Sequence, residues 1–183
     1  IESGANPNAV TSKSGQTALM WAISERHLDV ISILLQADAD IHAVSVRHFT
    51  PIMFAARAGN VEIAKLLIQK GATPNNTTYG HAPLVIAIEQ GHVAMARFLL
   101  EEGADPNITM DNGNRPLSAS LAIGGRQRGY DPNAPVYEPV DKEFLIRDLL
   151  KNGADPNGRR RVPLPGSRVF SPDGQASGFD RGP

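Results

Sequence analysis

The chain lacks cysteine altogether, since none occurs among its 183 residues. Disulfide bonds, thiolate zinc sites, iron–sulfur clusters and a cysteine nucleophile are therefore excluded, while the redox compartment is left open. Aromatic residues account for only 5% of the sequence, and neither sign of charge dominates, because the formal net charge is −1. A nucleic-acid-binding protein usually carries a strongly basic face, so this balance argues against nucleic acid and favours protein partners.

Long apolar runs are missing as well. A membrane-spanning helix needs roughly 18 or more apolar residues in succession, and the sequence contains no such stretch. Its first residues, IESGANPN, lack the basic leader and apolar segment of a signal peptide. We therefore expect one soluble globular unit without membrane insertion, and the sequence leaves cytoplasm and periplasm open as compartments.

A short motif typical of a turn, by contrast, recurs several times along the sequence. The sequences GANPN, GATPN, GADPN and GADPN begin at Gly4, Gly71, Gly103 and Gly153, and DADIH stands in the same place at Asp38. A second marker, read as TALMWAI, TPIMFAA, APLVIAI and RPLSASL, recurs in phase with the turn. Both markers keep a spacing of 32–34 residues apart from a last turn-to-turn step of 50. Such a period predicts a solenoid, in which each unit is too thin to bury its own apolar face.

Each unit predicts two helices followed by a loop. In the second unit, the Thr50 hydroxyl suits an N-cap and Pro51 suits the first helical turn. Gly59 can end this helix in the left-handed conformation, and the following NVEIAKLLIQKG carries its apolar residues at helical spacing. The GATPN turn then stops the second helix and leads into the loop that joins the next unit.

These features resemble the ankyrin repeat, a turn and two helices in 33 residues with a T-P-L-H lead. The likeness is carried by residues 15–43, 50–75 and 82–107 and extends to about residue 158. It implies an all-α solenoid of stacked helix-turn-helix units joined by β-turn or hairpin loops. The phrases GQTALMWA and LLEEGADPN are similar to those of long bacterial multi-repeat ankyrin proteins.

The period also predicts the domain organisation. Residues 1–14 align with the end of a repeat, which we interpret as part of a longer protein. The four predicted repeats cover residues 15–48, 49–79, 80–111 and 112–158. An insertion at about 125–141 separates the helices of the fourth repeat, and we interpret its 125–140 loop as functional. Residues 159–183, rich in Gly, Pro and Arg, are predicted to form an extended tail.

Some residues depart from the family pattern. The His of T-P-L-H is replaced in the four repeats by Met20, Met53, Val85 and Ser118. Ala82 and Arg115 replace the capping Thr, a loss that typically costs about 1 kcal/mol. Arg26 and Asp38 stand where glycine is expected, so we predict strain at both helix ends of the first full repeat.

Other departures concern burial. Asp148 stands at the position of Ile33, Leu66 and Phe98, and we expect its carboxylate to reach solvent or a partner in the insertion. His27 and His92 begin second helices, and we interpret them as capping and packing residues rather than metal ligands. The residues Trp21, Phe54, Ile86 and Ala119 share one position and are interpreted as core or half-buried.

Catalytic motifs are not found. The sequence has no His-Glu-x-x-His, no Gly-x-Ser-x-Gly and no phosphate-binding Gly-x-x-x-x-Gly-Lys, and its five histidines lack ligand spacing. We therefore predict no catalytic, cofactor or metal site, and we predict that this chain is not an enzyme.

The resemblance implies where a partner would bind. Ankyrin proteins usually dock partners on a concave face built from loop tips and the exposed side of the first helices. We transfer these positions to the repeats of this sequence one by one, and we take aromatic and Arg residues as the strongest anchors. Two tyrosines of the insertion complete the predicted partner-binding set. The set is Arg47, Phe49, Arg57, Tyr79, His81, Glu89, Gln90, Asn114, Tyr130 and Tyr137.

The sequence thus predicts a non-catalytic scaffold that binds a protein through the concave surface and the 125–140 loop. Three alternatives stay open at this point. The chain can instead be a structural subunit of a larger assembly, a docking module of a longer enzyme, or a small-molecule hydrolase that uses the insertion as a lid.

Overall fold

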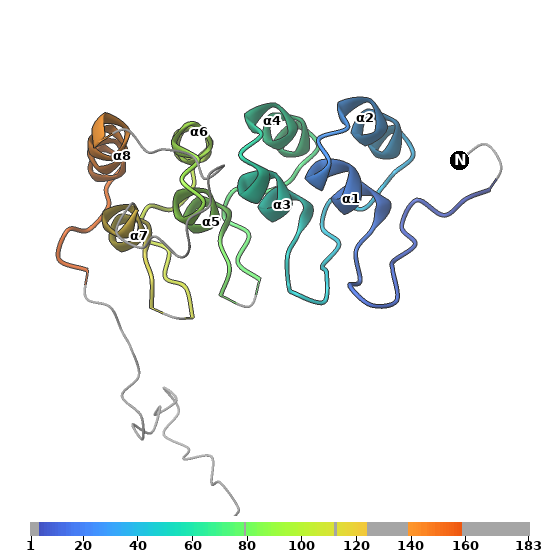
Figure 1. Cartoon of the computed structure of the whole chain (residues 1–183), viewed down its shortest axis with the longest axis horizontal. Coiled ribbons are helices and arrows are strands. Elements are labelled where there is room, and N and C mark those ends of the chain that lie inside the picture. The colour runs from blue at the N-terminus through green and yellow to red at the C-terminus, as the bar shows by residue number, and fades with distance from the viewer. Residues whose placement is uncertain (1–3, 79, 112, 124–138, 159–183) are drawn as a thin grey trace, which may run out of the picture.

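The computed structural model describes residues 4–78, 80–111, 113–123 and 139–158. Within them, helices lie in two rows (Figure 1), with α1, α3, α5 and α7 in one row and α2, α4, α6 and α8 in the other. The helices are α1 (Ala18–Ser24), α2 (Leu28–Gln36), α3 (Pro51–Ala58), α4 (Val61–Gln69), α5 (Pro83–Glu89), α6 (Val93–Glu101), α7 (Pro116–Ala122) and α8 (Pro139–Lys151). The predicted all-α solenoid of helix pairs is confirmed.

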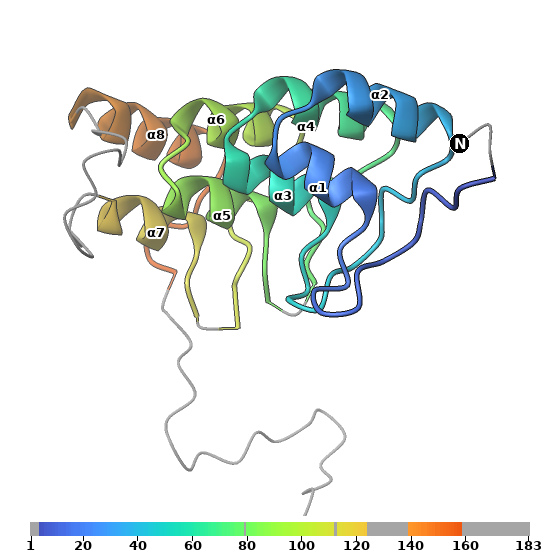
Figure 2. The same cartoon turned by 45° about the vertical axis from the view of Figure 1, so that its right-hand side comes forward.

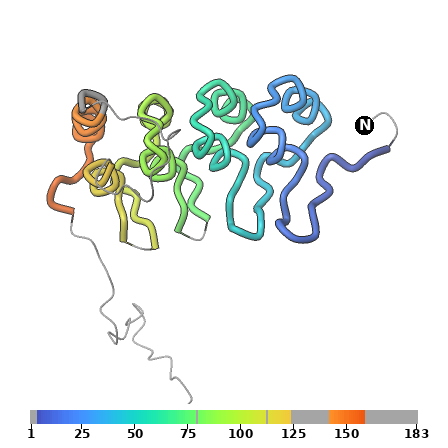
Figure 3. The backbone as a smooth tube through the Cα atoms, in the orientation of Figure 1, coloured from blue at the N-terminus to red at the C-terminus, as the bar shows by residue number. Residues whose placement is uncertain are grey.

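One apolar core runs through all four pairs. Each first helix packs on the second helix of its own pair and on the first helix of the next pair, as the tube in Figure 3 lets the reader follow. Met20, Met53 and Val85, which stand at the His position of the family lead, are completely buried. Apolar packing therefore holds these turns, because burial of such side chains contributes about 1.5–3 kcal/mol each.

The expected strain in the first pair is confirmed. Arg26 has φ 60° and Asp38 has φ 57°, so both lie in the left-handed region. This conformation costs a residue with a side chain roughly 1 kcal/mol. Arg26 gains a compensating contact, because its Nη2 donates to Ala58 O of the next pair over 2.6 Å.

Gly59 shows why glycine is needed at the equivalent position of the second pair. Its φ is 67°, and a Cβ atom placed there would lie 2.5 Å from the His92 ring. A hydrogen bond between His92 Nε2 and Arg57 O, 3.1 Å apart, holds the ring in this space. His92 therefore packs at the turn between α3 and α4, although neither it nor His27 makes the side-chain cap that we expected.

The helix caps differ from the prediction in two repeats. Thr17 caps α1 by accepting a hydrogen bond from Met20 N over 3.3 Å. The Thr50 hydroxyl, however, is buried without a hydrogen-bond partner among the described residues, so its predicted capping role is wrong. In the fourth repeat, Ser118 of the first turn binds back to the N-cap residue, since its Oγ accepts from Arg115 N and donates to Arg115 O, each over 2.9 Å.

Asparagines in the recurrent turn tie one repeat to the next. The Nδ2 group donates to the first carbonyl of the following turn over 2.8–3.4 Å, and Oδ1 accepts from the third amide over 2.7 Å. The asparagines that make this pair of bonds are Asn8, Asn75 and Asn107. The turn therefore does more than stop a helix, because it also joins neighbouring layers at one edge.

Asp148 finds a partner that we did not expect. Its Oδ2 lies 2.7 Å from Arg97 Nε of α6, so the two side chains form an ion pair between neighbouring repeats. The prediction was that this carboxylate reaches solvent or a partner in the insertion; its side chain is 28% exposed, and its ion-pair partner belongs to the preceding repeat. Helix α8 begins at Pro139, within the range assigned to the insertion, and the rest of the 125–140 loop lies outside the described residues.

Trp21 differs from the residues at its equivalent positions. Phe54, Ile86 and Ala119 are buried at 5–6% exposure, as expected for core residues, whereas Trp21 is 50% exposed. Val30 and Ile33 of α2 are likewise 44% and 57% exposed. All three residues belong to the first helix pair, and the described residues before it, 4–17, form no further helix.

Candidate functional site

The loops that precede the first helices project side by side from the helical rows, as Figure 2 shows. Antiparallel bridges between Val10 and Thr17 and between Thr78 and His81 hold two of them in hairpin form. The first and second loops are also joined to each other, because Val46 N donates to Ser14 O over 2.9 Å. This bond places the tips of two repeats next to each other.

A hollow of about 370 Å³ lies where these two loops meet α3. The first loop contributes Lys13, Ser14 and Gln16, the second contributes Ser45, Val46, Arg47 and Phe49, and α3 contributes Phe54 and Arg57. We call this space the basic hollow, because three of its lining side chains are cations and none is an acid. It therefore brings together three predicted site residues, Arg47, Phe49 and Arg57.

Phe49 forms an aromatic wall of the basic hollow. Its ring meets Phe54 edge-on with centroids 5.7 Å apart, and it lies 5.0 Å from the ring of His81. The backbone around it is fixed by Ser45, whose Oγ accepts from Phe49 N over 3.1 Å. Phe49 is thus half-buried and rigidly held, and His81 of the predicted set supports it from the third repeat.

The loop that carries Arg47 and Phe49 is strained. His48 has φ 61°, although the residues at the equivalent positions in the other repeats are glycines. Those glycines are Gly15, Gly80 and Gly113, with φ between 61° and 76°. Strain of this kind is retained where the surrounding structure imposes it and often accompanies functional loops.

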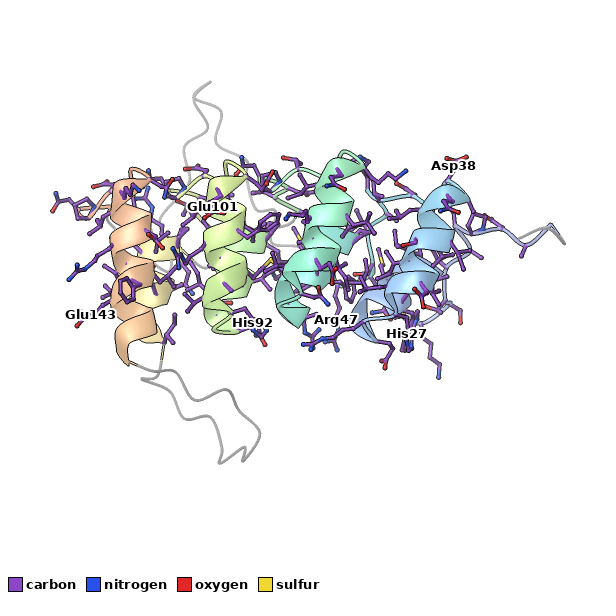
Figure 4. All side chains as sticks on the ribbon, turned by 90° about the horizontal axis from the view of Figure 1, so that it is seen from above. His27, Asp38, Arg47, His92, Glu101 and Glu143 are labelled. Atoms are coloured by element: carbon purple, nitrogen blue, oxygen red, sulfur yellow. The ribbon has the colours of Figure 1, made fainter. Side chains whose placement is uncertain are left out.

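The cations of the basic hollow are exposed and form no ion pair with a described residue. The ion pairs that the described residues do form, Arg97–Asp148 and Arg115–Asp155, lie elsewhere. Figure 4 shows Arg47 at the edge of the molecule where His27 and His92 begin the second helices, opposite Asp38 and Glu101 at their other ends. Lys13, Arg47 and Arg57 are therefore available to an anionic group from outside.

The next part of this surface has the opposite charge. Glu89 at the end of α5 accepts from Asn114 Nδ2 over 3.2 Å, and Gln90 lies beside it as an exposed residue. The structure thus brings these three predicted residues together one repeat away from the basic hollow. Three further predicted residues, Tyr79, Tyr130 and Tyr137, lie outside the described residues.

Lys13, Gln16 and Phe54 line the basic hollow but are absent from the predicted set. Lys13 and Gln16 stand one repeat before Val46 and Phe49, at the equivalent positions of the first loop. Their place in the repeat is therefore the feature of the sequence that assigns them to the same surface. Phe54 was interpreted as a core residue, which its 6% exposure supports, and its ring edge still reaches the hollow. The register thus predicts Lys13 and Gln16 as loop positions of the binding face, and the structure adds that they line the same hollow as residues of the second repeat.

The described residues carry no cluster of three or more His, Asp or Glu side chains arranged to hold a metal ion. None of their helices has the length and apolarity needed to cross a bilayer. The described residues thus bring together three cations and an aromatic wall where two loop tips meet α3.

Comparisons with known proteins agree with this architecture. A family model described as "Ankyrin repeats (3 copies)" matches residues 42–110, and one described as "Ankyrin repeat" matches residues 14–46, so that together they cover more than half of the chain. The chain is similar to the Nuclear factor NF-kappa-B p105 subunit of Gallus gallus, at 34% identity over 76 residues, which are 41% of this chain and 8% of that protein.

A second relative is Ankyrin repeat, SAM and basic leucine zipper domain-containing protein 1 of Dasypus novemcinctus. It is 37% identical over 70 residues, which are 36% of this chain and 15% of that protein. The matches thus span at most 15% of the length of these two relatives, and neither is bacterial, so the suggested likeness to bacterial proteins gains no support from them. The stacked helix pairs, the recurrent turn and the two family matches together show that the chain belongs to the ankyrin repeat family.

Proposed function

We propose that this chain is a non-catalytic docking module that binds a partner protein through its loop tips and the exposed side of its first helices. Ankyrin repeats are generally protein–protein interaction modules rather than enzymes, which supports a protein partner. The observation that carries the choice of surface is the basic hollow, where Arg47, Phe49 and Arg57 converge from a loop and a helix. Aromatic and Arg side chains dominate the energetics of interfaces.

Rigidity of the loops also supports this surface. The Val46–Ser14 bond and the Ser45–Phe49 bond hold the two loop tips in one arrangement before any partner arrives. A preorganised surface loses less conformational entropy on binding than a mobile one, so more of the contact energy appears as affinity. The opposite charges of the basic hollow and Glu89 would further orient a partner along the row of first helices.

Site-specific crosslinking tests the proposed surface. A photoreactive residue would be placed at Val46 or Gln90, which are exposed beside Arg47 and Glu89, and a matched control at Lys65, which is exposed on α4 in the other row of helices. We expect the native partner to crosslink at positions 46 and 90 but not at position 65. Crosslinking at position 65 alone would move the docking surface to the second helices and contradict the proposal.

A structural subunit of a larger assembly is the second candidate, and one observation favours it. Trp21, Val30 and Ile33 of the first helix pair expose apolar surface, whereas the positions equivalent to Trp21 in later repeats are buried. The mass of the native complex, measured by light scattering after size exclusion, separates the candidates. An assembly dispersed by Trp21→Lys but not by Arg47→Ala would favour the structural role.

A further inference from the structure

We propose that the basic hollow binds an acidic, extended segment of the partner, with a carboxylate held by Arg47 and Arg57 and a neighbouring apolar side chain placed against Phe49. This inference rests on the proposed docking function and names the chemistry of the partner at one part of that surface.

The size of the basic hollow favours an extended segment. Its volume of about 370 Å³ is near the lower end of the roughly 300–1,000 Å³ typical of ligand pockets. A space of this size accepts one or two side chains, whereas a folded domain would rest on the surface without entering it. The occupant is therefore a short stretch of chain that inserts its side chains between the two loop tips.

The charge of the basic hollow favours an acidic segment. Lys13, Arg47 and Arg57 place three positive charges around it, although the whole chain has a formal net charge of −1. None of the lining residues is an acid, so the surrounding charge is not neutralised from within. An Arg guanidinium matches the planar geometry of a carboxylate and can donate two parallel hydrogen bonds to it.

The aromatic wall adds a second requirement. Phe49 is half-buried and meets Phe54 edge-on at 5.7 Å, while Val46 at the rim is 62% exposed. An apolar side chain next to the acidic residue would cover this surface and remove it from water. Contact with an apolar wall also lowers the local dielectric constant, which strengthens the attraction between the carboxylate and the two guanidinium groups.

A nucleic acid fits this surface less well. A polyanion that continued from the basic hollow along the row of first helices would meet Glu89 at the end of α5. A protein segment can instead present an acidic residue to Arg57 and a basic or neutral one to Glu89. The charge pattern therefore favours a peptide whose acidic residues are confined to one end.

Selection of short random peptides by phage display on the full 183-residue chain provides the first test. We expect enriched peptides to carry Asp or Glu beside an apolar residue, and we expect this enrichment to disappear with the double change Arg47→Ala and Arg57→Ala. The matched control is Lys65→Ala with Lys70→Ala, which removes two exposed cations outside the hollow. This control should leave the enrichment intact.

Fluorescence anisotropy with the most enriched peptide then measures affinity. We expect each Arg→Ala change to raise Kd by about tenfold, the size typical of one lost charge-assisted contact. Replacement of the peptide's Glu by Gln should have the same effect, and raising NaCl from about 0.05 to 0.3 M should weaken binding. Arg47 and Arg57 are exposed, so circular dichroism should show an unchanged fold and melting curve.

Several results would overturn the inference. These are the absence of any enriched sequence, enrichment of peptides without acidic residues, and displacement of the peptide by a single-stranded oligothymidine probe that binds more tightly. If Glu89→Lys abolished peptide binding while the Arg47 and Arg57 changes had no effect, the acidic-segment inference would fail. The docking function of the surface would still stand, so the two proposals fail in distinguishable ways.

Discussion

His42 interrupts the asparagine links between repeats, and its replacement by asparagine should stabilise the protein. It stands at the position of Asn8, Asn75 and Asn107, each of which makes two hydrogen bonds to the next turn. In the described part of the chain, Gly71 O accepts no such bond and Thr73 N donates none to the side chain at position 42. The seam between the first and second repeats therefore lacks a link that the other seams possess.

The backbone at His42 already has the required geometry. His42 N donates to Asp40 Oδ1 over 2.8 Å, and Asn107 N donates to Asp105 Oδ1 over the same distance. His42→Asn therefore changes the side chain without rebuilding the turn. Two new bonds contribute about 0.5–1.5 kcal/mol each, and their exposure to water and the ordering of the side chain reduce the gain. We expect a net stabilisation of about 1 kcal/mol.

Urea unfolding measures this effect directly. Trp21, the single tryptophan, lies in the first repeat and reports on the unfolding of that repeat by fluorescence, while circular dichroism reports on all helices. We expect a higher midpoint with an unchanged slope, and a melting temperature raised by about 2–4 °C. The converse change, Asn75→His, should remove a link and lower stability by a similar amount.

His42→Ala is the control that separates loss of the imidazole from gain of the amide. If His42→Asn were no more stable than His42→Ala, the added side chain would form no link. The idea that these asparagines hold neighbouring layers together would then be refuted, and the bonds of Asn75 and Asn107 would count only as consequences of stacking.

Three further changes test the packing of the solenoid. Gly59→Ala should lower the free energy of unfolding, measured in urea, by about 2 kcal/mol, because the new methyl group meets the His92 ring and φ is 67°. An unchanged free energy of unfolding would show that this ring moves freely. Asp38→Gly should raise the melting temperature in a calorimetric scan by a degree or two, because it relieves roughly 1 kcal/mol of left-handed strain, of which about 0.5 kcal/mol is offset by the backbone freedom that glycine loses on folding. A lower melting temperature would contradict the strain. Leu67→Ala should lower the free energy of unfolding by about 3 kcal/mol, because Leu67 is completely buried. Amide hydrogen exchange in α4 should accelerate as a result, and unchanged exchange would mean that Leu67 does not couple α4 to the packed layers.

Much of the fold was readable from short segments of sequence. The period, the helix pairs and the strain at Arg26 and Asp38 follow from interactions between residues close together in the chain. Helix spacing, turn formers and the conformational freedom of glycine act over a few residues, so one repeat reveals them. Because the same unit recurs, a pattern that is weak in one copy is reinforced by the others.

The candidate site was readable only in part. Arg47, Phe49 and Arg57 follow from their register in the repeat, as do Lys13 and Gln16, whereas the meeting of these residues in one hollow depends on how closely the first loop approaches the second. That distance is set by the Val46–Ser14 bond, which joins residues of different repeats. No local pattern encodes a contact between two loops.

Local sequence was sufficient to specify a stack of helix pairs, because each pair repeats the same turns and the same apolar positions. Local sequence was insufficient to predict that Asp148 pairs with Arg97, that the Thr50 hydroxyl has no hydrogen-bond partner among the described residues, and that Trp21 is exposed. Each of these depends on which atoms of a neighbouring layer lie within a few ångströms. Stacking brings such atoms together across more than thirty residues of chain, and their positions exist only once the layers have assembled.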